Sequence, residues 1–83
     1  MCRNITTLRG LQPAATPEEI EAAARQYVRK VSGVQAVSTA NEEAFERAVL
    51  VVADATTGLL ATLPARRQPP KSEPPLRRLR RAG

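Results

Sequence analysis

Charge and proline divide this chain into two unlike parts, and this division most constrains what it can fold into. Residues 1–63 carry six Lys/Arg and seven Asp/Glu, a net charge of −1. Residues 64–83 carry seven Lys/Arg, one acid and five of the seven prolines, a net charge of +6, so the two parts sum to +5. Such a tail has too few apolar residues to offset its ordering entropy. We predict a folded domain over residues 1–63 and a disordered basic tail over residues 64–83 that adds no core.

Neither a disulfide bond nor a structural metal site is available to stabilise the folded part. Cys2 is the only cysteine and the chain has no histidine, so the monomer can form neither a disulfide nor the usual four-ligand zinc site. About sixty residues lie near the lower limit for a core that lacks such staples. Self-association or a partner would supply the missing apolar burial, and we predict no cofactor.

The first helix is predicted over residues 17–32. Thr16 is a good N-cap, Pro17 suits the first helical position, and Glu19 completes a capping box three residues after the cap. Gly33 then follows as a left-handed cap. The apolar residues at helical spacing on one face are Ile20, Ala24, Tyr27, Val28 and Val31.

A second helix is predicted over residues 40–63, with Thr39 as its N-cap and Pro64 ending it. Its weak points are two adjacent valines and Gly58, so a strand over residues 50–53 is an alternative. The predicted inner face consists of Phe45, Ala48, Val49, Val52, Thr56, Leu59, Leu60 and Leu63. The expected fold is therefore all-α: a small hairpin of two main helices, crossed by an N-terminal arm.

Leu50 and Val51 fall outside the inner face of the second helix. Either they cover the apolar residues of the N-terminal segment (Ile5, Leu8 and Leu11) or they form a contact surface. In the second case, the two residues would pair across the two-fold axis of a homodimer.

The tail contains an arginine run that suggests contact with nucleic acid. Arginines bind phosphates in a bidentate manner, and no aromatic residue lies among them to stack on bases, so binding would ignore sequence. An acidic protein partner or the codon usage of a GC-rich genome are alternatives. The candidate residues are Arg66, Arg67, Arg77, Arg78, Arg80 and Arg81.

The N-terminus offers a weaker hypothesis. Removal of Met1 would leave Cys2 with a free α-amine beside its thiol, an N,S pair able to bind a metal or act in redox chemistry, and Arg3 would favour the thiolate. The alternative is an ordinary small residue packed against the helices.

The sequence argues against an enzyme and against a membrane protein. The carboxylates lie in the first turns of the helices, where capping explains them, and no acid–base constellation is visible. The opening residues contain no secretory apolar segment, and no apolar run reaches the ~18 residues of a membrane span. A cytoplasmic location is the default expectation.

Polar residues at the end of the first helix and the start of the second suggest an anion site. Arg29, Lys30, Ser32 and Asn41 would lie close together if the helices form a hairpin. Helix capping and matching of the helix dipole explain the same residues without a ligand.

Four sequence blocks resemble an uncharacterised bacterial family, domain of unknown function 2277. They are residues 1–5, 15–24, 27–33 and 40–49, and the resemblance covers about residues 1–63. It implies a small, mostly helical bacterial protein with no assigned activity, and it adds Arg3 and Asn4 to the candidate anion or partner site. The chain differs from similar sequences at Leu50, Val51 and Gly58, where those are more polar. Its matching polar residues are Cys2, Arg3, Asn4, Arg29, Lys30, Ser32, Gly33, Asn41 and Glu42.

Overall fold

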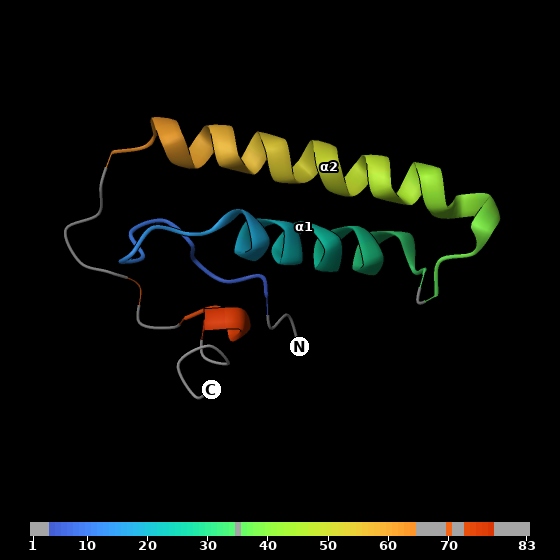
Figure 1. Cartoon of the computed structure of the whole chain (residues 1–83), viewed down its shortest axis with the longest axis horizontal. Coiled ribbons are helices and arrows are strands. Elements are labelled where there is room, and N and C mark those ends of the chain that lie inside the picture. The colour runs from blue at the N-terminus through green and yellow to red at the C-terminus, as the bar shows by residue number, and fades with distance from the viewer. Residues whose placement is uncertain (1–3, 35, 65–69, 71–72, 78–83) are drawn as a thin grey trace.

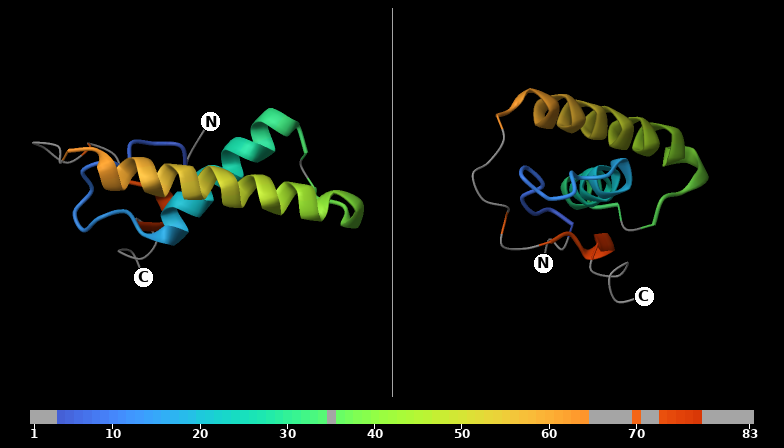
Figure 2. Two further views of the ribbon diagram at one scale, coloured as in Figure 1. Left: turned by 90° about the horizontal axis from the view of Figure 1, so that it is seen from above. Right: turned by 60° about the vertical axis from the view of Figure 1, so that its left-hand side comes forward.

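The chain forms a hairpin of two helices, α1 over Pro17–Ser32 and α2 over Thr39–Thr62 (Figure 1). The structure is a computed structural model that describes residues 4–34, 36–64, 70 and 73–77. In these residues there is no strand, so the all-α prediction is confirmed and the alternative strand is wrong. Viewed from above, α2 crosses α1 at an angle (Figure 2).

Helix α1 begins and ends where local chemistry predicts. The Thr16 hydroxyl accepts a hydrogen bond from the Glu19 amide at 3.2 Å, and the Glu19 carboxylate accepts one from the Thr16 amide at 2.8 Å. At the other end, Gly33 has φ of 72° and its amide donates to the Arg29 carbonyl at 3.0 Å. The capping box and the left-handed glycine cap are both confirmed.

Helix α2 begins one residue earlier than predicted. Its N-cap is Ser38, not Thr39, and no side chain caps the helix start. The Ser38 carbonyl instead accepts a hydrogen bond from the Asn41 amide at 3.1 Å, so Thr39 is already helical. The helix passes through Gly58 and stops before Pro64, because the residue preceding a proline is driven into extended backbone.

The core consists of two clusters along the hairpin. One joins Ala24 and Val28 of α1 to Phe45 and Val49 of α2. The other is formed by the N-terminal arm, residues 4–16, and buries Leu8 and Leu11 against Ile20, with Ala15, Ala53 and Leu60 packed around them. The arm therefore supplies part of the core that two helices alone would lack.

Four residues predicted to face inward are exposed: Tyr27 (48%) and Val31 (65%) in α1, and Leu59 (55%) and Leu63 (37%) at the end of α2. In α2 the core clusters include Ala53 and Leu60 and leave Leu59 and Leu63 outside them. The buried stripe of α1 advances in steps of four residues, through Ile20, Ala24 and Val28, which leaves Tyr27 on its flank. Val31 lies in the last turn, beyond the final buried residue of the helix.

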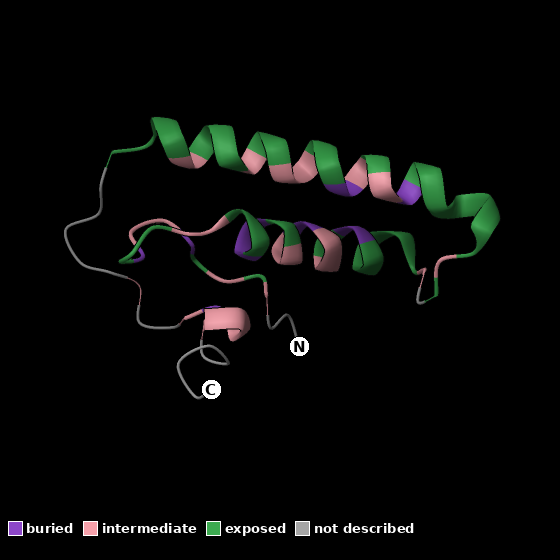
Figure 3. Ribbon diagram, in the orientation of Figure 1, coloured by how far each residue is buried: buried purple, intermediate pink, exposed green. Residues whose placement is uncertain are grey.

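The N-terminal arm does not pack beneath Leu50 and Val51. Leu50 and Val51 are 70% and 62% exposed, whereas the arm packs near Ala53 and Leu60 of α2. Figure 3 shows that exposed residues follow the side of α2 that faces away from α1. The first of the two sequence interpretations is therefore wrong, and these side chains are available for contact.

Part of the tail packs against the folded domain. Residues 73–77, the C-terminal strap, end in a helical turn at residues 75–77, and the Pro74 side chain is fully buried. The strap is an exception to the prediction that the tail adds no core, because Pro74 is buried there and Arg77 bonds to Glu19 and Ala14. The predicted disorder of the tail otherwise concerns positions outside the described residues.

Candidate functional site

A cationic depression lies on the side of α1 that faces away from α2. Its volume is about 390 Å³. The backbone amide of Asn4 donates a 2.7 Å hydrogen bond to Oε1 of the Gln26 side chain, which brings the arm against this side of the helix. Three of the six residues predicted for an anion site therefore converge here. The lining residues are Asn4, Ala22, Arg25, Gln26, Arg29 and Lys30.

Arg25 lines this depression but its charge is already compensated. Its guanidinium donates to both Glu46 oxygens, at 2.7 and 2.9 Å, and to Oε2 of Glu21 at 3.2 Å. Hydrogen bonding to Glu46 raises the pKa of Arg25, and the same bond lowers the pKa of Glu46. The guanidinium carbon also lies 5.9 Å from the centre of the Phe45 ring. Arg29 and Lys30 are consequently the cations of the depression that form no ion pair with a carboxylate of the described residues.

Ser32 and Asn41, also predicted for this site, do not line the depression. The Ser32 hydroxyl donates to the Arg29 carbonyl at 3.4 Å and accepts from the Val34 amide at 3.2 Å, so it serves the end of α1. Asn41 is exposed in the first turn of α2. Cys2 and Arg3 lie outside the described residues, and the hypotheses on them stay predictions.

A buried ion pair holds the C-terminal strap on α1. The Arg77 guanidinium donates through Nε to Oε2 of Glu19 at 3.1 Å and through Nη2 to Oε1 at 3.0 Å. Nη2 also donates to the Ala14 carbonyl at 3.2 Å. The Glu19 side chain is fully buried and that of Arg77 is 11% exposed. A carboxylate removed from water in this way needs such a partner.

The surroundings of Glu19 act on its pKa in opposite directions. Burial raises the pKa, whereas the hydrogen bonds from the Thr16 amide and from Arg77 lower it, and the net shift is downward. The carboxylate is therefore held in its charged form. Nη1 of Arg77 is buried with no hydrogen-bond partner among the described residues.

Sequence reasoning placed Glu19 in a capping box and Arg77 in a nucleic-acid tail, but it did not join them. They lie 58 positions apart, and no local pattern indicates such a contact. Arg77 is also the one predicted tail arginine that falls in the described residues. The five outside them are Arg66, Arg67, Arg78, Arg80 and Arg81.

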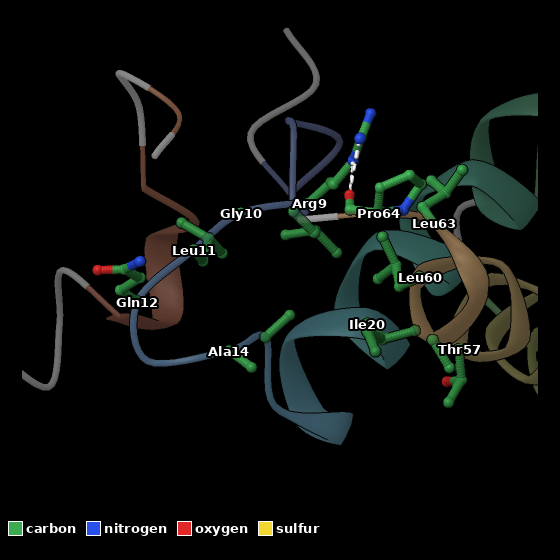
Figure 4. A pocket seen from close by; sticks show the side chains of 13 residues that line it. Arg9, Gly10, Leu11, Gln12, Ala14, Ile20, Thr57, Leu60, Leu63 and Pro64 are labelled. Carbon is green, nitrogen blue, oxygen red and sulfur yellow. Dashed lines mark hydrogen bonds between the residues drawn. The ribbon is translucent and has the colours of Figure 1, made fainter. Parts of the chain in front are cut away.

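A second pocket, of about 430 Å³, separates the arm from the C-terminal half of α2 (Figure 4). Arg9 is the charged residue among those that line it, and its guanidinium is bound to the Pro64 carbonyl at 2.7 and 2.9 Å. Its other lining residues are mostly apolar, with Leu8, Ile20 and Leu60 among them. No group here is placed for acid–base catalysis.

Two features are absent from the described residues. They contain no group of three His, Cys, Asp or Glu side chains placed to hold a metal ion. Nor does any helix among them have the length and apolar character needed to cross a membrane.

The chain belongs to the family of uncharacterized conserved proteins DUF2277, whose sequence pattern matches residues 1–82. The resemblance stated from the sequence is thereby confirmed, and its extent is corrected. It does not end near residue 63 but continues through the basic tail. No curated protein and no solved structure matches the chain.

Proposed function

We propose that this family member is a non-enzymatic binding module that holds a polyanion, with nucleic acid as the leading class, on the outer side of α1. One observation carries the proposal. The strap anchored by Arg77 and the described ends of the chain lie on the side of α1 away from α2 (Figures 1 and 2). The cationic depression is lined by residues of the arm and of α1, with none from α2.

The spacing of these groups suits an extended chain of phosphates. Glu19 and Lys30 are eleven residues apart, which is close to three full helical turns. The two residues therefore lie on nearly the same side of α1, about 16 Å apart along its axis. Arg77, the first residue of the arginine run, is bound to Glu19, and Arg29 and Lys30 follow along the same helix.

The chemistry favours phosphates without base recognition. Exposed arginines bind phosphate oxygens and release counterions, and no aromatic side chain lines the depression to stack on a base. The family match through residue 82 supports a function for the tail over codon usage alone, because the tail is part of the family's pattern.

The test is binding of a labelled DNA duplex by fluorescence anisotropy over a series of salt concentrations. We expect the logarithm of the binding constant to fall with the logarithm of the salt concentration with a slope of about −3 to −5. This slope is shallower than the one expected if every available cation contacted a phosphate. Replacing Arg78, Arg80 and Arg81 with Ser, while leaving Arg77 in its ion pair, is expected to remove most of the binding. Scrambled duplex sequences are expected to bind equally well.

A charge-matched pair of variants tests the role of α1. Arg29→Gln is expected to weaken binding and to reduce the slope by about 0.9, the contribution of one phosphate contact. Arg47→Gln removes the same charge from an exposed position on α2 and is expected to change neither. Equal losses in both variants, or no binding to DNA or RNA at ~50 mM salt, would overturn the proposal. Weak salt dependence combined with sensitivity to Leu76 and Leu79 would instead indicate a protein partner.

A further inference from the structure

The buried ion pair between Glu19 and Arg77 joins the basic tail to α1. Both Glu19 oxygens accept hydrogen bonds from the Arg77 guanidinium, at 3.0 and 3.1 Å, and Nη2 of Arg77 also donates to the Ala14 carbonyl. The Glu19 side chain is fully buried and that of Arg77 is 11% exposed. The pair therefore fixes one point of the tail on the helix that carries Arg29 and Lys30.

Stability alone is a poor explanation for this pair. Removing two charges from water costs about as much as their mutual attraction returns, so a buried ion pair adds little to stability compared with apolar side chains of similar size. Such a pair does favour one register, because either partner is unfavourable when it is buried without the other. Glu19 and Arg77 are 58 positions apart, so the register in question is that of the tail on the folded domain.

Glu19 is itself held in place by the start of α1. Its Oε1 accepts a 2.8 Å hydrogen bond from the Thr16 amide, and its own amide donates to the Thr16 hydroxyl at 3.2 Å. The capping box thus fixes the carboxylate that receives Arg77. Because the Arg77 guanidinium is buried against Glu19, it is not the group that meets a phosphate, and its effect on a polyanion passes through the residues that follow it.

We propose that Glu19 is a positioning residue for polyanion binding, an acidic side chain that raises the affinity of this protein for nucleic acid by holding the tail on α1. The inference rests on the proposed function, because it concerns how the tail and the cations of α1 act together. Two binding segments joined by a short length of chain act on one ligand at a high effective concentration. This concentration falls roughly as the −3/2 power of the length of chain between them.

The ion pair shortens the chain that connects the tail arginines to the folded domain. With the pair formed, Arg78 directly follows a residue that is bound to α1. With the strap released, the chain before Arg78 is held at Pro64, whose carbonyl accepts from Arg9, fourteen positions earlier. A connection about fourteen times longer lowers the effective concentration by up to about 50-fold.

The proposal predicts a change in affinity whose sign is opposite to that expected from charge alone. Glu19→Gln removes a negative charge, and electrostatics by itself would then strengthen DNA binding. Glutamine also serves at this position of a capping box, so the helix start is kept. If Glu19 positions the tail, affinity falls instead. We expect a loss of roughly 3-fold or more, below the ~50-fold limit because burial of Pro74 still favours the strap.

The matched control is Glu18→Gln. Glu18 directly precedes Glu19, is exposed and forms no ion pair with a described residue. Its replacement removes the same charge from the same turn and is expected to leave the affinity unchanged or slightly higher. Fluorescence anisotropy of a labelled DNA duplex with the full chain at about 50 mM salt measures both variants, and circular dichroism monitors their helix content.

Repeating both substitutions in a chain with Arg78, Arg80 and Arg81 replaced by Ser separates positioning from a purely structural role. This chain lacks the arginines that follow the strap, so Glu19→Gln is expected to behave there like Glu18→Gln. A loss of equal size with and without these arginines would mean that Glu19 acts only through the fold, and it would overturn the proposal. So would a Glu19→Gln chain that binds DNA as tightly as the Glu18→Gln chain.

A second pair of variants covers the case in which Glu19→Gln unfolds the chain. Arg77→Gln removes the other partner and is expected to weaken binding by a similar roughly 3-fold or more. Arg47→Gln removes the same charge from an exposed position on α2 and is expected to have no effect, so equal affinities in these two chains would also overturn the proposal. The natural chain reports separately on the proposed function. If it does not bind DNA, both proposals fail, whereas binding with the expected salt dependence and no difference within the variant pairs refutes the positioning role alone.

Discussion

The two helices differ in what defines them. Helix α1 has a capping box at one end and a left-handed glycine at the other, and both ends are made by residues within four positions. Helix α2 has no side-chain cap, no basic residue in its last turn and two buried residues among twenty-four. The first helix is specified by its own sequence, whereas the second is held in place by what it packs against.

The contacts that hold α2 are few and can be named. Phe45 and Val49 pack on Ala24 and Val28, and Arg25 bridges to Glu46 beside the Phe45 ring. The ion pair is partly exposed, so its contribution is small next to that of the buried side chains. Phe45 and Val49 are therefore the two positions of α2 that are fully inside the core.

The largest predicted effect is at Phe45. Phe45→Ala removes a buried ring from the cluster that joins the helices and is expected to lower the free energy of unfolding by about 3–5 kcal/mol. Leu50→Ala, at an exposed position of the same helix, is expected to stay within about 0.5 kcal/mol. Urea denaturation followed by circular dichroism measures both, and a small loss at Phe45 would show that α2 does not depend on this contact.

The next effect concerns the strap. Arg77→Ala leaves the Glu19 carboxylate without its charged partner and is expected to cost about 1–3 kcal/mol, limited because release of the strap lets water reach the carboxylate. The same denaturation experiment checks it. Truncation after residue 63 is expected to cost at least as much. An unchanged stability in both chains would mean that the strap adds nothing to the fold.

The pH dependence of stability separates this ion pair from the rest. The folded pKa of Glu19 lies below its ordinary value of 4.5, so the carboxylate stabilises the fold fully above that value. This contribution is lost as the pH falls from 4.5 through the folded pKa. The pKa of Glu46 is also lowered, so the natural chain must be compared with the Glu19→Gln variant. The stability of this variant is expected to fall less than that of the natural chain between neutral and acid pH. Identical acid slopes in the two chains would contradict it.

A smaller effect contrasts the two helix starts directly. Thr16→Ala removes a side-chain cap and is expected to cost about 0.5–2 kcal/mol. Ser38→Ala removes a residue of the same kind whose side chain makes no cap bond, and is expected to cost less than about 0.5 kcal/mol. Thermal and urea unfolding measure the pair. Equal costs would mean that α2 is capped in solution after all.

The smallest effect has the opposite sign. Gly58→Ala is expected to stabilise the chain by about 0.4–1 kcal/mol, because alanine loses less backbone entropy on entering a helix. Beyond the neighbouring backbone of its own helix, the added methyl group meets no atom within 4 Å. An increase in the urea midpoint checks it. A loss of stability would indicate that this part of α2 is covered by a partner.

Sequence alone located three of the depression's residues, because two of them are adjacent in the last turn of α1 and the third was singled out by the family resemblance. It did not find Arg25 or Gln26, which read as ordinary helix-surface residues. The Glu19–Arg77 pair was missed for a different reason. Each residue had a sufficient local explanation, and only the folded chain brings them together.

What the sequence by itself determined is the part of the structure governed by neighbours within about four positions. The limits of α1, its two caps, the stop of α2 before Pro64 and the all-α class follow from hydrogen bonds and backbone preferences at that range. Tertiary structure alone decided which flank of each helix is buried, where the arm packs, and that Pro74 and Arg77 join the folded domain. These contacts connect residues tens of positions apart, and they depend on the shape of a core too small to cover every apolar side chain of the hairpin.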